Sequence, residues 1–260
     1  METLILIFAA LFGLVFGSFL NVCIYRIPRD KSIVWPPSGC PQCGARIKWY
    51  DNIPLFSYLF LLGKCRACKK PISMQYPLVE FLTGALTVLC VWWYGISIWT
   101  FVVLAAIYAL VSLSIIDLEF MIIPDRFSLG LIVLGLAFAW CNPHFEGSWW
   151  QREVAALIGA SGGLFGVLGL ALIGTWIFKK EAMGGGDVKL MGGVGAFIGW
   201  EGVLTTIVLG SFFGLVYAVF LMIFKGKKGG DAIPFGPFLS LGALINLFYL
   251  IRPRMLVIEF

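Results

Sequence analysis

The sequence has little charge and an excess of apolar residues. Only 13% of its 260 residues are Asp, Glu, Lys or Arg, whereas 60% are hydrophobic, and the mean hydropathy is +0.94. A soluble domain carries roughly 25% charged and 45–50% apolar residues. A soluble enzyme, a disordered protein and a disulfide-rich secreted scaffold are therefore excluded. The chain is predicted to be an all-α polytopic membrane protein.

The chain also lacks the features of a cleaved leader and of a repeat protein. No basic residue precedes the first apolar run, residues 3–25, where Glu2 is the only early charge. Signal peptides begin with a basic segment and end at a small-residue cleavage site, whereas this run leads into Asn21 and Arg26. The run is therefore predicted to be a retained first helix, and no internal repeat or low-complexity tract stands out.

About eight transmembrane helices are predicted, because about 20 apolar residues cross a bilayer. The sixth run is short and rich in glycine, so it is tilted, half-inserted or joined to the seventh by a bend near Gly199–Gly202. The eight apolar runs are residues 3–25, 77–94, 98–116, 127–142, 154–178, 188–200, 203–224 and 233–251.

The basic residues indicate how these helices are oriented. If the N-terminus is outside, 16 of the 19 Lys and Arg residues, Lys227 and Lys228 among them, fall on cytoplasmic segments. Only Arg152, Arg252 and Arg254 then fall outside. Cytoplasmic loops are enriched in Lys and Arg, so the N-terminus is predicted to lie outside. The net charge of +5 is thus a topology signal, and no nucleic-acid partner is expected.

One loop is long enough to form a domain. Residues 26–76 contain nine of the 19 basic residues, six of the 12 prolines and four of the seven cysteines. The predicted organisation is a first transmembrane helix over residues 1–25, a cytoplasmic loop domain over 26–76 and a transmembrane core over 77–260.

The four loop cysteines form two Cys-x-x-Cys pairs, Cys40/Cys43 and Cys65/Cys68, separated by 21 residues. Two such pairs can complete a tetrahedron of thiolates around one Zn²⁺ ion. Disulfides or idle cysteines are the alternatives, but disulfides are rare in the reducing cytoplasm. A zinc ion with four cysteine ligands has no open position and is structural. It would replace the hydrophobic core that a short loop cannot build.

Two aspartates beside apolar runs are candidate catalytic residues, because acidic groups near hydrocarbon are costly. Asp117 ends the third run, and Asp187 begins the sixth after Gly184, Gly185 and Gly186. Two crossings separate them, so both are predicted on the cytoplasmic side. Two carboxylates in a low-dielectric site share a proton, as in aspartic proteases: one takes a proton from water while the other polarises the scissile carbonyl. The glycines leave room for an extended peptide.

Each acidic residue also has a simpler explanation when taken alone. Asp117 could pair with Arg126 or a lysine, and Asp187 could cap the sixth helix. Glu80 could hydrogen-bond another helix instead of acting directly. His144, the only histidine, lies in a predicted outside loop, which excludes Ser-His or Cys-His catalysis on the cytoplasmic side.

Taken together, the motifs resemble the type IV prepilin peptidase family, membrane-embedded aspartic proteases with a Gly-x-Gly-Asp motif. The resemblance covers nearly the whole chain, and neither aspartate nor any of the four cysteines departs from it. The motifs, in order, are Gly17-Ser-Phe-Leu-Asn-Val22, Tyr25-Arg-Ile-Pro28, the two cysteine pairs, Asn52-Ile-Pro54, Tyr76-Pro-Leu-Val-Glu80, Ile116-Asp117, Ile123-Pro-Asp125, Gly184-Gly-Gly-Asp-Val-Lys189 and Ile233-Pro-Phe-Gly-Pro237.

The resemblance implies an enzyme of the bacterial inner membrane that removes the short basic leader of prepilins or pseudopilins at the cytoplasmic face. Asp117 and Asp187 would be the protease pair, supported by Gly184, Gly186 and Lys189. Members with the four-cysteine loop also methylate the new N-terminus with S-adenosylmethionine, and Gly63 lies in the region linked to that activity. No Rossmann-type glycine motif supports the methyl transfer independently.

The cytoplasmic basic residues would not attract a basic leader. We therefore expect local carboxylates, Asp125, Glu119 or Asp51, to recognise it, together with insertion of the substrate helix into the lipid bilayer.

Two other classes of protein compete with the peptidase. A proton-coupled transporter would use Asp117 and Asp187 as proton carriers, but it would place them near the bilayer midplane and often in repeated halves. A zinc-stabilised assembly platform would need no aspartate pair.

Overall fold

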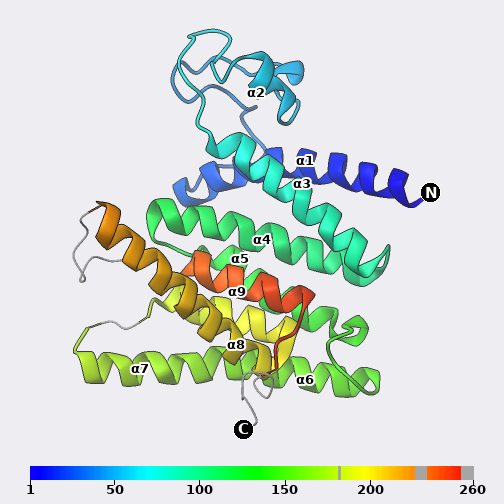
Figure 1. The fold of residues 1–260 in the computed structure, drawn as a ribbon, viewed down its shortest axis with the longest axis vertical. Helices are drawn as coiled ribbons and strands as arrows, with labels where there is room; N and C mark the ends of the chain where they lie inside the picture. Colours follow the sequence, from blue (N-terminus) through cyan, green and yellow to red (C-terminus); the bar gives the residue numbers. More distant parts are fainter. Residues whose placement is uncertain (181–182, 226–232, 253–260) are drawn as a thin grey trace. The chain divides into compact units, whose positions relative to one another are not determined.

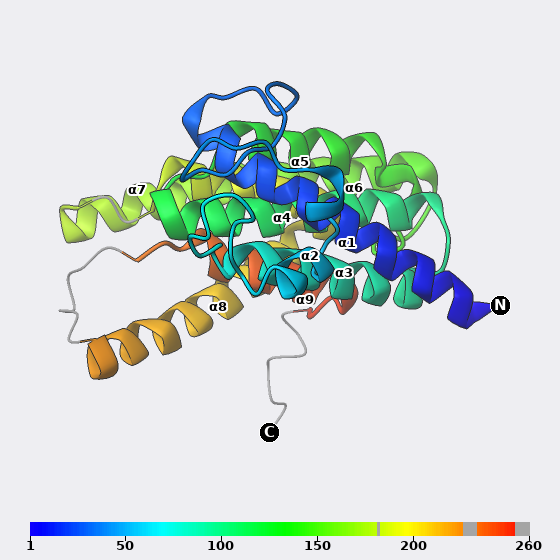
Figure 2. The same ribbon diagram turned by 90° about the horizontal axis from the view of Figure 1, so that it is seen from above.

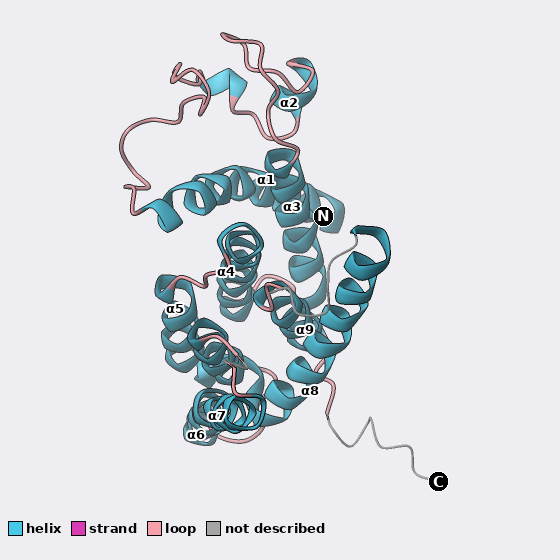
Figure 3. Cartoon of the chain, turned by 90° about the vertical axis from the view of Figure 1, so that its left-hand side faces the viewer, coloured by secondary structure: helices cyan, strands magenta, loops and turns pink. Residues whose placement is uncertain are grey.

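The computed structural model describes residues 1–180, 183–225 and 233–252. Lys227, Lys228 and Arg254, which contribute to the predicted orientation, lie outside these ranges. The described ranges form helices, turns and loops and no strands (Figure 3). The chain divides into two compact units, Met1–Thr100 and Phe101–Phe260. The predicted all-helical architecture is confirmed.

In the first unit, two helices lie side by side: α1, Glu2–Arg26, and α3, Gln75–Tyr94 (Figure 1). Small residues allow their backbones to approach closely. A Cβ atom at Gly17 would lie only 2.7 Å from the Cα of Glu80. The loop between the two helices contains one short helix and two 3-10 turns, which are α2, Phe56–Phe60, η1, Ile27–Arg29, and η2, Trp49–Asp51.

The helices of the second unit pack mainly against α8, and the apolar helix α4, Ile98–Phe120, begins at the boundary between the units. Side chains of α4 that face away from solvent include Val103, Ile107 and Leu113. The other elements are α5, Asp125–Ala137, η3, Ala139–Cys141, α6, Trp149–Ser161, the π-helical turn η4, Gly162–Gly166, α7, Val167–Phe178, α8, Gly185–Lys225, and α9, Gly236–Phe248.

Glycines bring the continuous segment α6–η4–α7 against the first half of α8. A Cβ atom at Gly159 would overlap the carbonyl oxygen of Gly195, and one at Gly163 would overlap the carbonyl oxygen of Met191. Close backbone approach of this kind replaces the hydrophobic driving force that helices lack in lipid. Beyond the contact the two segments separate, and Figures 1 and 2 both show the C-terminal half of α8 diverging from α7.

The predicted bend between the sixth and seventh apolar runs is confirmed. Both runs lie in α8, and Gly199 interrupts it with non-helical dihedral angles of φ 71° and ψ 178°. The side-chain amide of Asn142 donates a 2.7 Å hydrogen bond to the carbonyl oxygen of Phe197, next to the bend. Asn142 also accepts a hydrogen bond from the backbone N–H of His144. Burial lowers the pKa of the His144 imidazole, whose Nε2 lies 2.9 Å from the Leu247 carbonyl oxygen.

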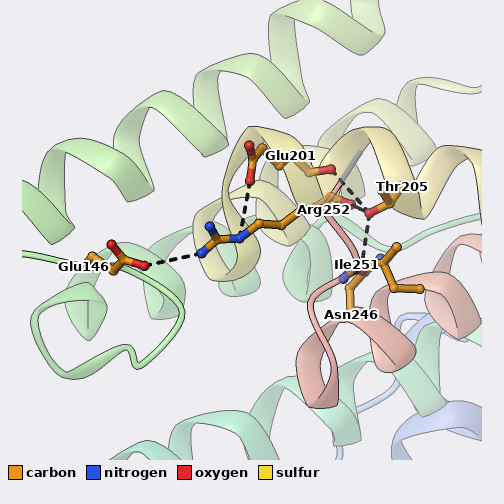
Figure 4. Close-up of polar contacts among 7 residues, drawn as sticks. Glu146, Glu201, Thr205, Asn246, Ile251 and Arg252 are labelled. Atoms are coloured by element: carbon orange, nitrogen blue, oxygen red, sulfur yellow. Dashed lines mark hydrogen bonds and ion pairs between the residues drawn. The ribbon is translucent and has the colours of Figure 1, made fainter. Parts of the chain in front are cut away.

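A polar cluster joins the end of α9 to α8 just beyond the bend (Figure 4). The guanidinium group of Arg252 lies 3.5 Å from a Glu146 carboxylate oxygen and 3.8 Å from a Glu201 carboxylate oxygen. The hydroxyl of Thr205 donates a 3.2 Å hydrogen bond to Oδ1 of Asn246. These contacts hold the C-terminal end of α9 against α8.

All eight predicted runs fall on helices, but they do not form eight separate long ones. Helices α5 and α9 have 13 residues each, fewer than the roughly 20 that cross a bilayer. The fourth run was predicted to reach residue 142, but α5 ends at Ala137 and gives way to a 3-10 turn. Five segments are long and apolar enough to cross, namely Glu2–Arg29, Gln75–Tyr94, Ile98–Phe120, Trp149–Phe178 and Gly185–Phe224.

Candidate functional site: a carboxylate pair and a four-cysteine cluster

Asp117 lies in the last turn of α4, with only 5% of its surface exposed. Its Oδ2 atom accepts a 2.9 Å hydrogen bond from the backbone N–H of Gly236, the first residue of α9. A Cβ atom at position 236 would lie 2.8 Å from the same oxygen, which explains why a glycine is present. No cation pairs with Asp117 in the described part of the chain, so its predicted alternative pairing with Arg126 or a lysine is not observed.

Asp187 lies in the first turn of α8, two residues after the helix begins at Gly185. It is therefore inside the helix and is not its N-cap residue. Its Oδ1 atom is buried and has no hydrogen-bond partner among the described residues. The carboxylate is close enough to Asp117 for their charges to interact. Buried polar atoms are nearly always paired, so an unpaired oxygen marks a place where water or a substrate can bind.

Ile123 connects the two aspartate-bearing helix ends. A Cβ atom at Gly186 would lie 2.9 Å from the Cβ of Ile123, and one at Gly236 would lie 3.0 Å from its Cδ1. The end of α4 and the beginnings of α8 and α9 therefore converge around this one side chain. The structure brings the two predicted carboxylates to one end of the second unit.

Lys189 forms an ion pair across the same end of the bundle. Its Nζ atom lies 2.7 Å and 2.9 Å from the two carboxylate oxygens of Asp125, in the first turn of α5. The lysine side chain is 39% exposed and the aspartate 56%, so the pair contributes at most about 1 kcal/mol to stability. Its clearer effect is to set the position of α8, two residues after Asp187, relative to α5.

The four loop cysteines converge as predicted. Cys40, Cys43, Cys65 and Cys68 have Sγ atoms that all lie within 4.8 Å of one another. Tetrahedral zinc–thiolate geometry needs sulfur separations of about 3.8 Å, so the donor set fits Zn²⁺ after a small contraction. Backbone N–H groups of Cys68 and Ala67 donate hydrogen bonds to the Cys65 sulfur and lower the pKa of that thiol to about 7. This favours the thiolate form that a metal requires.

The two cysteine pairs fold in the same way. In the first, the N–H of Gly44 donates a 2.8 Å hydrogen bond to the carbonyl oxygen of Cys40; in the second, the N–H of Lys69 donates a 2.9 Å hydrogen bond to that of Cys65. Gly44 and Lys69 both adopt left-handed backbone conformations, with φ of 71° and 60°. The tight turn expected from Gly44 is present, and the second pair repeats it without a glycine.

Glu80 anchors the loop and, as the alternative to a direct role predicted, also hydrogen-bonds another helix, through Ser18 of α1. Its buried carboxylate accepts a 2.8 Å hydrogen bond from the backbone N–H of Leu55, a residue with a positive φ of 61°. Asn21 completes the attachment by donating a 3.1 Å hydrogen bond to the Tyr76 carbonyl oxygen at the start of α3. The motif residues on α1 and α3 thus hold the loop where it leaves and rejoins the helices.

Gly63 has a structural reason to be glycine. Its φ is 67°, and a Cβ atom there would lie 2.9 Å from the hydroxyl oxygen of Tyr58. Its carbonyl oxygen accepts a 2.7 Å hydrogen bond from Ile72. The proposed link of Gly63 to methyl transfer therefore has a competing explanation in the folding of the loop.

Two of the three carboxylates expected to bind a leader are already paired within the chain. Asp125 is held by Lys189, and Asp51 accepts hydrogen bonds of 2.6–3.0 Å from Arg66. The Arg66 guanidinium lowers the pKa of the Asp51 carboxyl. Glu119 is exposed and has no ion-pair partner in the described ranges.

Sequence reasoning missed two residues of the aspartate site. The Ile233–Pro237 motif contained Gly236 but gave no sign that its N–H binds Asp117, and Ile123 was noted only as part of a motif. Both roles depend on contacts between distant segments, which spacing does not reveal.

The helices and the site together define the class of protein: it is a multi-pass helical membrane protein with two acidic side chains at one end of its bundle. Residues 11–94 match the family model described as bacterial peptidase A24 N-terminal domain, and residues 102–219 match that of the type IV leader peptidase family. The chain belongs to the type IV leader peptidase family and is a peptidase A24 family enzyme. The two matches meet near the boundary between the two compact units.

Several relatives are named prepilin leader peptidase/N-methyltransferase. The one from Xanthomonas campestris pv. campestris is 37% identical over 93% of this chain and 90% of its own length. Those from Pseudomonas aeruginosa and Neisseria gonorrhoeae are 35% and 34% identical and cover 92% and 91% of this chain, each over 88% of its own length. No solved structure matches the chain.

Proposed function

We propose that this protein is an intramembrane aspartic endopeptidase that removes the short basic leader of type IV prepilins or pseudopilins at the cytoplasmic membrane face. The observation that carries the proposal is the convergence of Asp117 and Asp187, from helices α4 and α8, at one end of the bundle. The family and the names of its relatives support the choice of substrate.

The two carboxylates supply the acid and the base. One ionised carboxylate takes a proton from a water molecule, which attacks the scissile carbonyl carbon, while the protonated partner hydrogen-bonds the carbonyl oxygen. The Gly236 N–H holds one oxygen of Asp117, whereas Oδ1 of Asp187 is left without a partner among the described residues. Gly184 and Gly185 are exposed beside Asp187, so an extended peptide meets no side chains there.

Glu119 is the carboxylate best suited to bind the basic leader. It lies two residues after Asp117 on α4 and, unlike Asp125 and Asp51, is not engaged by a cation of the described chain. An exposed carboxylate close to the cleavage site favours a basic segment of the substrate over a neutral one.

We extend the proposal to N-methylation of the new N-terminus, because the relatives are named for both activities. S-adenosylmethionine would supply an electrophilic methyl group. The neutral amine of the new N-terminus would accept this methyl group and lose a proton, and the electron pair of the broken carbon–sulfur bond would stay on sulfur. The four cysteines would hold a structural Zn²⁺ ion and take no part in either reaction.

The membrane arrangement follows from the same proposal. With the N-terminus outside, the cysteine loop would lie in the cytoplasm of a bacterium and the aspartates where a leader emerges from the inner membrane. The transporter alternative is less well supported, because Asp117 and Asp187 lie at helix ends and not in the middle of their spans.

Mass spectrometry of a prepilin-like peptide tests the proposal with full-length protein in detergent. We expect the parent to remove the leader. Asp117→Asn and Asp187→Asn should each lose cleavage by roughly 10³-fold or more, because removal of one member of a catalytic pair disables it. Glu153→Gln, which keeps the shape of a carboxylate on α6 outside the pair, is the matched control. Cleavage by either dyad variant at the rate of this control would overturn the assignment.

A further inference from the structure

Residues 53–62 of the first unit form an apolar segment inside an otherwise basic loop. Only Pro54 and Ser57 in this segment are not hydrophobic, and no charged residue lies between Asp51 and Lys64. An apolar run of about 10–14 residues is too short to cross a bilayer and is typical of a buried core helix or of a re-entrant or interfacial segment. The structure decides between these two alternatives.

The apolar side chains of this segment face outward from the first unit. Ser57 is buried instead, and its hydroxyl donates a 3.0 Å hydrogen bond to the Tyr50 carbonyl oxygen. A helix that faces water has the opposite arrangement, with its polar side outward. The segment is therefore not a buried core helix. The exposed fractions are 54%, 67%, 84% and 83% for Phe56, Leu59, Phe60 and Leu62.

The backbone of the segment is hydrogen-bonded within the first unit. The N–H of Leu59 donates a 3.1 Å hydrogen bond to the carbonyl oxygen of Leu55, and the N–H of Ile53 donates a 2.9 Å hydrogen bond to the Ser57 hydroxyl. Lipid cannot hydrogen-bond a peptide group, so only backbone that is already paired is stable in hydrocarbon. The segment meets this condition. The other paired N–H groups include those of residues 55–57 and 61–63.

The segment is attached at a level inside the apolar spans of α1 and α3. Its Leu55 N–H donates a 2.8 Å hydrogen bond to Glu80, whose carboxylate also bonds Ser18 of α1. Glu80 is the sixth residue of α3, so at a rise of about 1.5 Å per residue it lies roughly 7 Å inside the start of that helix. Leu78 and Phe81, on either side of Glu80, are exposed. The segment thus begins at the level of the apolar α3 surface that a bilayer covers.

We propose that residues 53–62 insert into the bilayer leaflet nearest the cysteine cluster, with their exposed apolar side chains among the lipid acyl chains. The basic residues that follow then lie where the phosphate head groups attract them. Part of the loop domain predicted over residues 26–76 therefore belongs to the membrane. The inference does not depend on the proposed peptidase activity. The basic residues are Lys64, Lys69 and Lys70, all of them exposed.

Photo-cross-linking of the full-length protein in liposomes tests the insertion. Photoreactive benzoylphenylalanine takes the place of Phe60 in one variant, of Leu62 in a second and of Arg46 in a third. Arg46 is an exposed residue of the same loop outside the segment, so it is the matched control. The liposomes contain phosphatidylethanolamine and phosphatidylglycerol, and mass spectrometry identifies the adducts. Zinc content and thermal unfolding confirm that each variant is folded.

We expect the labels at positions 60 and 62 to form adducts with acyl chains about 10-fold more often than the label at position 46, because burial of one large apolar side chain favours insertion by at least that factor. Three results would overturn the proposal. Adducts with head groups alone would place the segment on the membrane surface. Adducts with another segment of the protein or with a second copy would show that protein covers this face. Equal labelling of lipid by all three variants would show that the segment has no preferred contact with the bilayer.

Discussion

The two compact units are held together in different ways. Between residues 27 and 74 of the first unit, Ser57 is the only buried residue, so the loop has almost no core of its own. In the second unit, helix α4 has fully buried side chains such as Val103, Ile107 and Leu113, and glycines bring α6 against the backbone of α8. The first unit therefore depends on a few specific polar and sulfur contacts, whereas the second depends on continuous packing.

Removal of zinc should produce the largest difference in stability between the two units. Structural zinc sites contribute about 10–16 kcal/mol to the folding of small zinc-binding peptides, and the loop has little else to replace that contribution. We expect Cys40→Ser, or chelation of the metal, to make the loop protease-sensitive and to abolish methylation while cleavage of the prepilin-like peptide is affected far less. Limited proteolysis and mass spectrometry measure the two effects.

The matched control for zinc removal is Cys23→Ser, a buried cysteine on α1 outside the cluster. Unchanged methylation and stability in the metal-free protein would show that the loop does not depend on its sulfur cluster.

Adding a single methyl group, by the substitution Gly163→Ala, should lower the stability of the second unit. In Gly163→Ala the new Cβ would overlap the Met191 carbonyl oxygen, so α8 has to move away. Overpacking of this kind costs typically about 1–3 kcal/mol. Thermal unfolding in detergent, with zinc content as a measure of the first unit, should show a lower Tm and unchanged metal binding.

Gly169→Ala is the control for this substitution, because nothing lies within 4 Å of a Cβ at that position of α7. It should be neutral or slightly stabilising, since alanine favours a helix over glycine by up to about 1 kcal/mol. Equal destabilisation by both substitutions would contradict the close-packing explanation.

The smallest expected effect lies inside the cysteine cluster itself. Lys69 adopts a left-handed conformation that costs a non-glycine residue about 1 kcal/mol, whereas Gly44 adopts it freely. Lys69→Gly should therefore strengthen zinc retention, and Gly44→Ala should weaken it, each by about 1 kcal/mol or less. Competition with a coloured chelator measures both. A loss of zinc affinity in Lys69→Gly would show that the lysine charge matters more than the turn.

The sequence predicted the helices well because apolar runs determine them locally. All eight runs fall on helices, the bend occurs at Gly199, and the four cysteines meet. The early end of α5 at Ala137 was not foreseen, because Trp140 and Cys141 continue the apolar run although the backbone has turned.

The sequence predicted the candidate site less completely. Asp117 and Asp187 could be placed on one side of the membrane by counting crossings, yet nothing in the spacing linked Asp117 to Gly236, which lies 119 residues away. The bond between Glu80 and Leu55, which are 25 residues apart, was also missed. Contacts of this kind depend on tertiary packing, which local composition does not encode.

The bond between Gly236 and Asp117 has a consequence for how the site tolerates mutation. Its donor belongs to the peptide backbone, so no side-chain substitution deletes it except proline, which has no N–H. Its acceptor is crowded, so any larger residue at 236 places a Cβ atom against the carboxylate. This part of the site is specified by the absence of a side chain. Functional descendants of this sequence are therefore expected to keep glycine at position 236, although glycine has no side chain that could take part in the reaction.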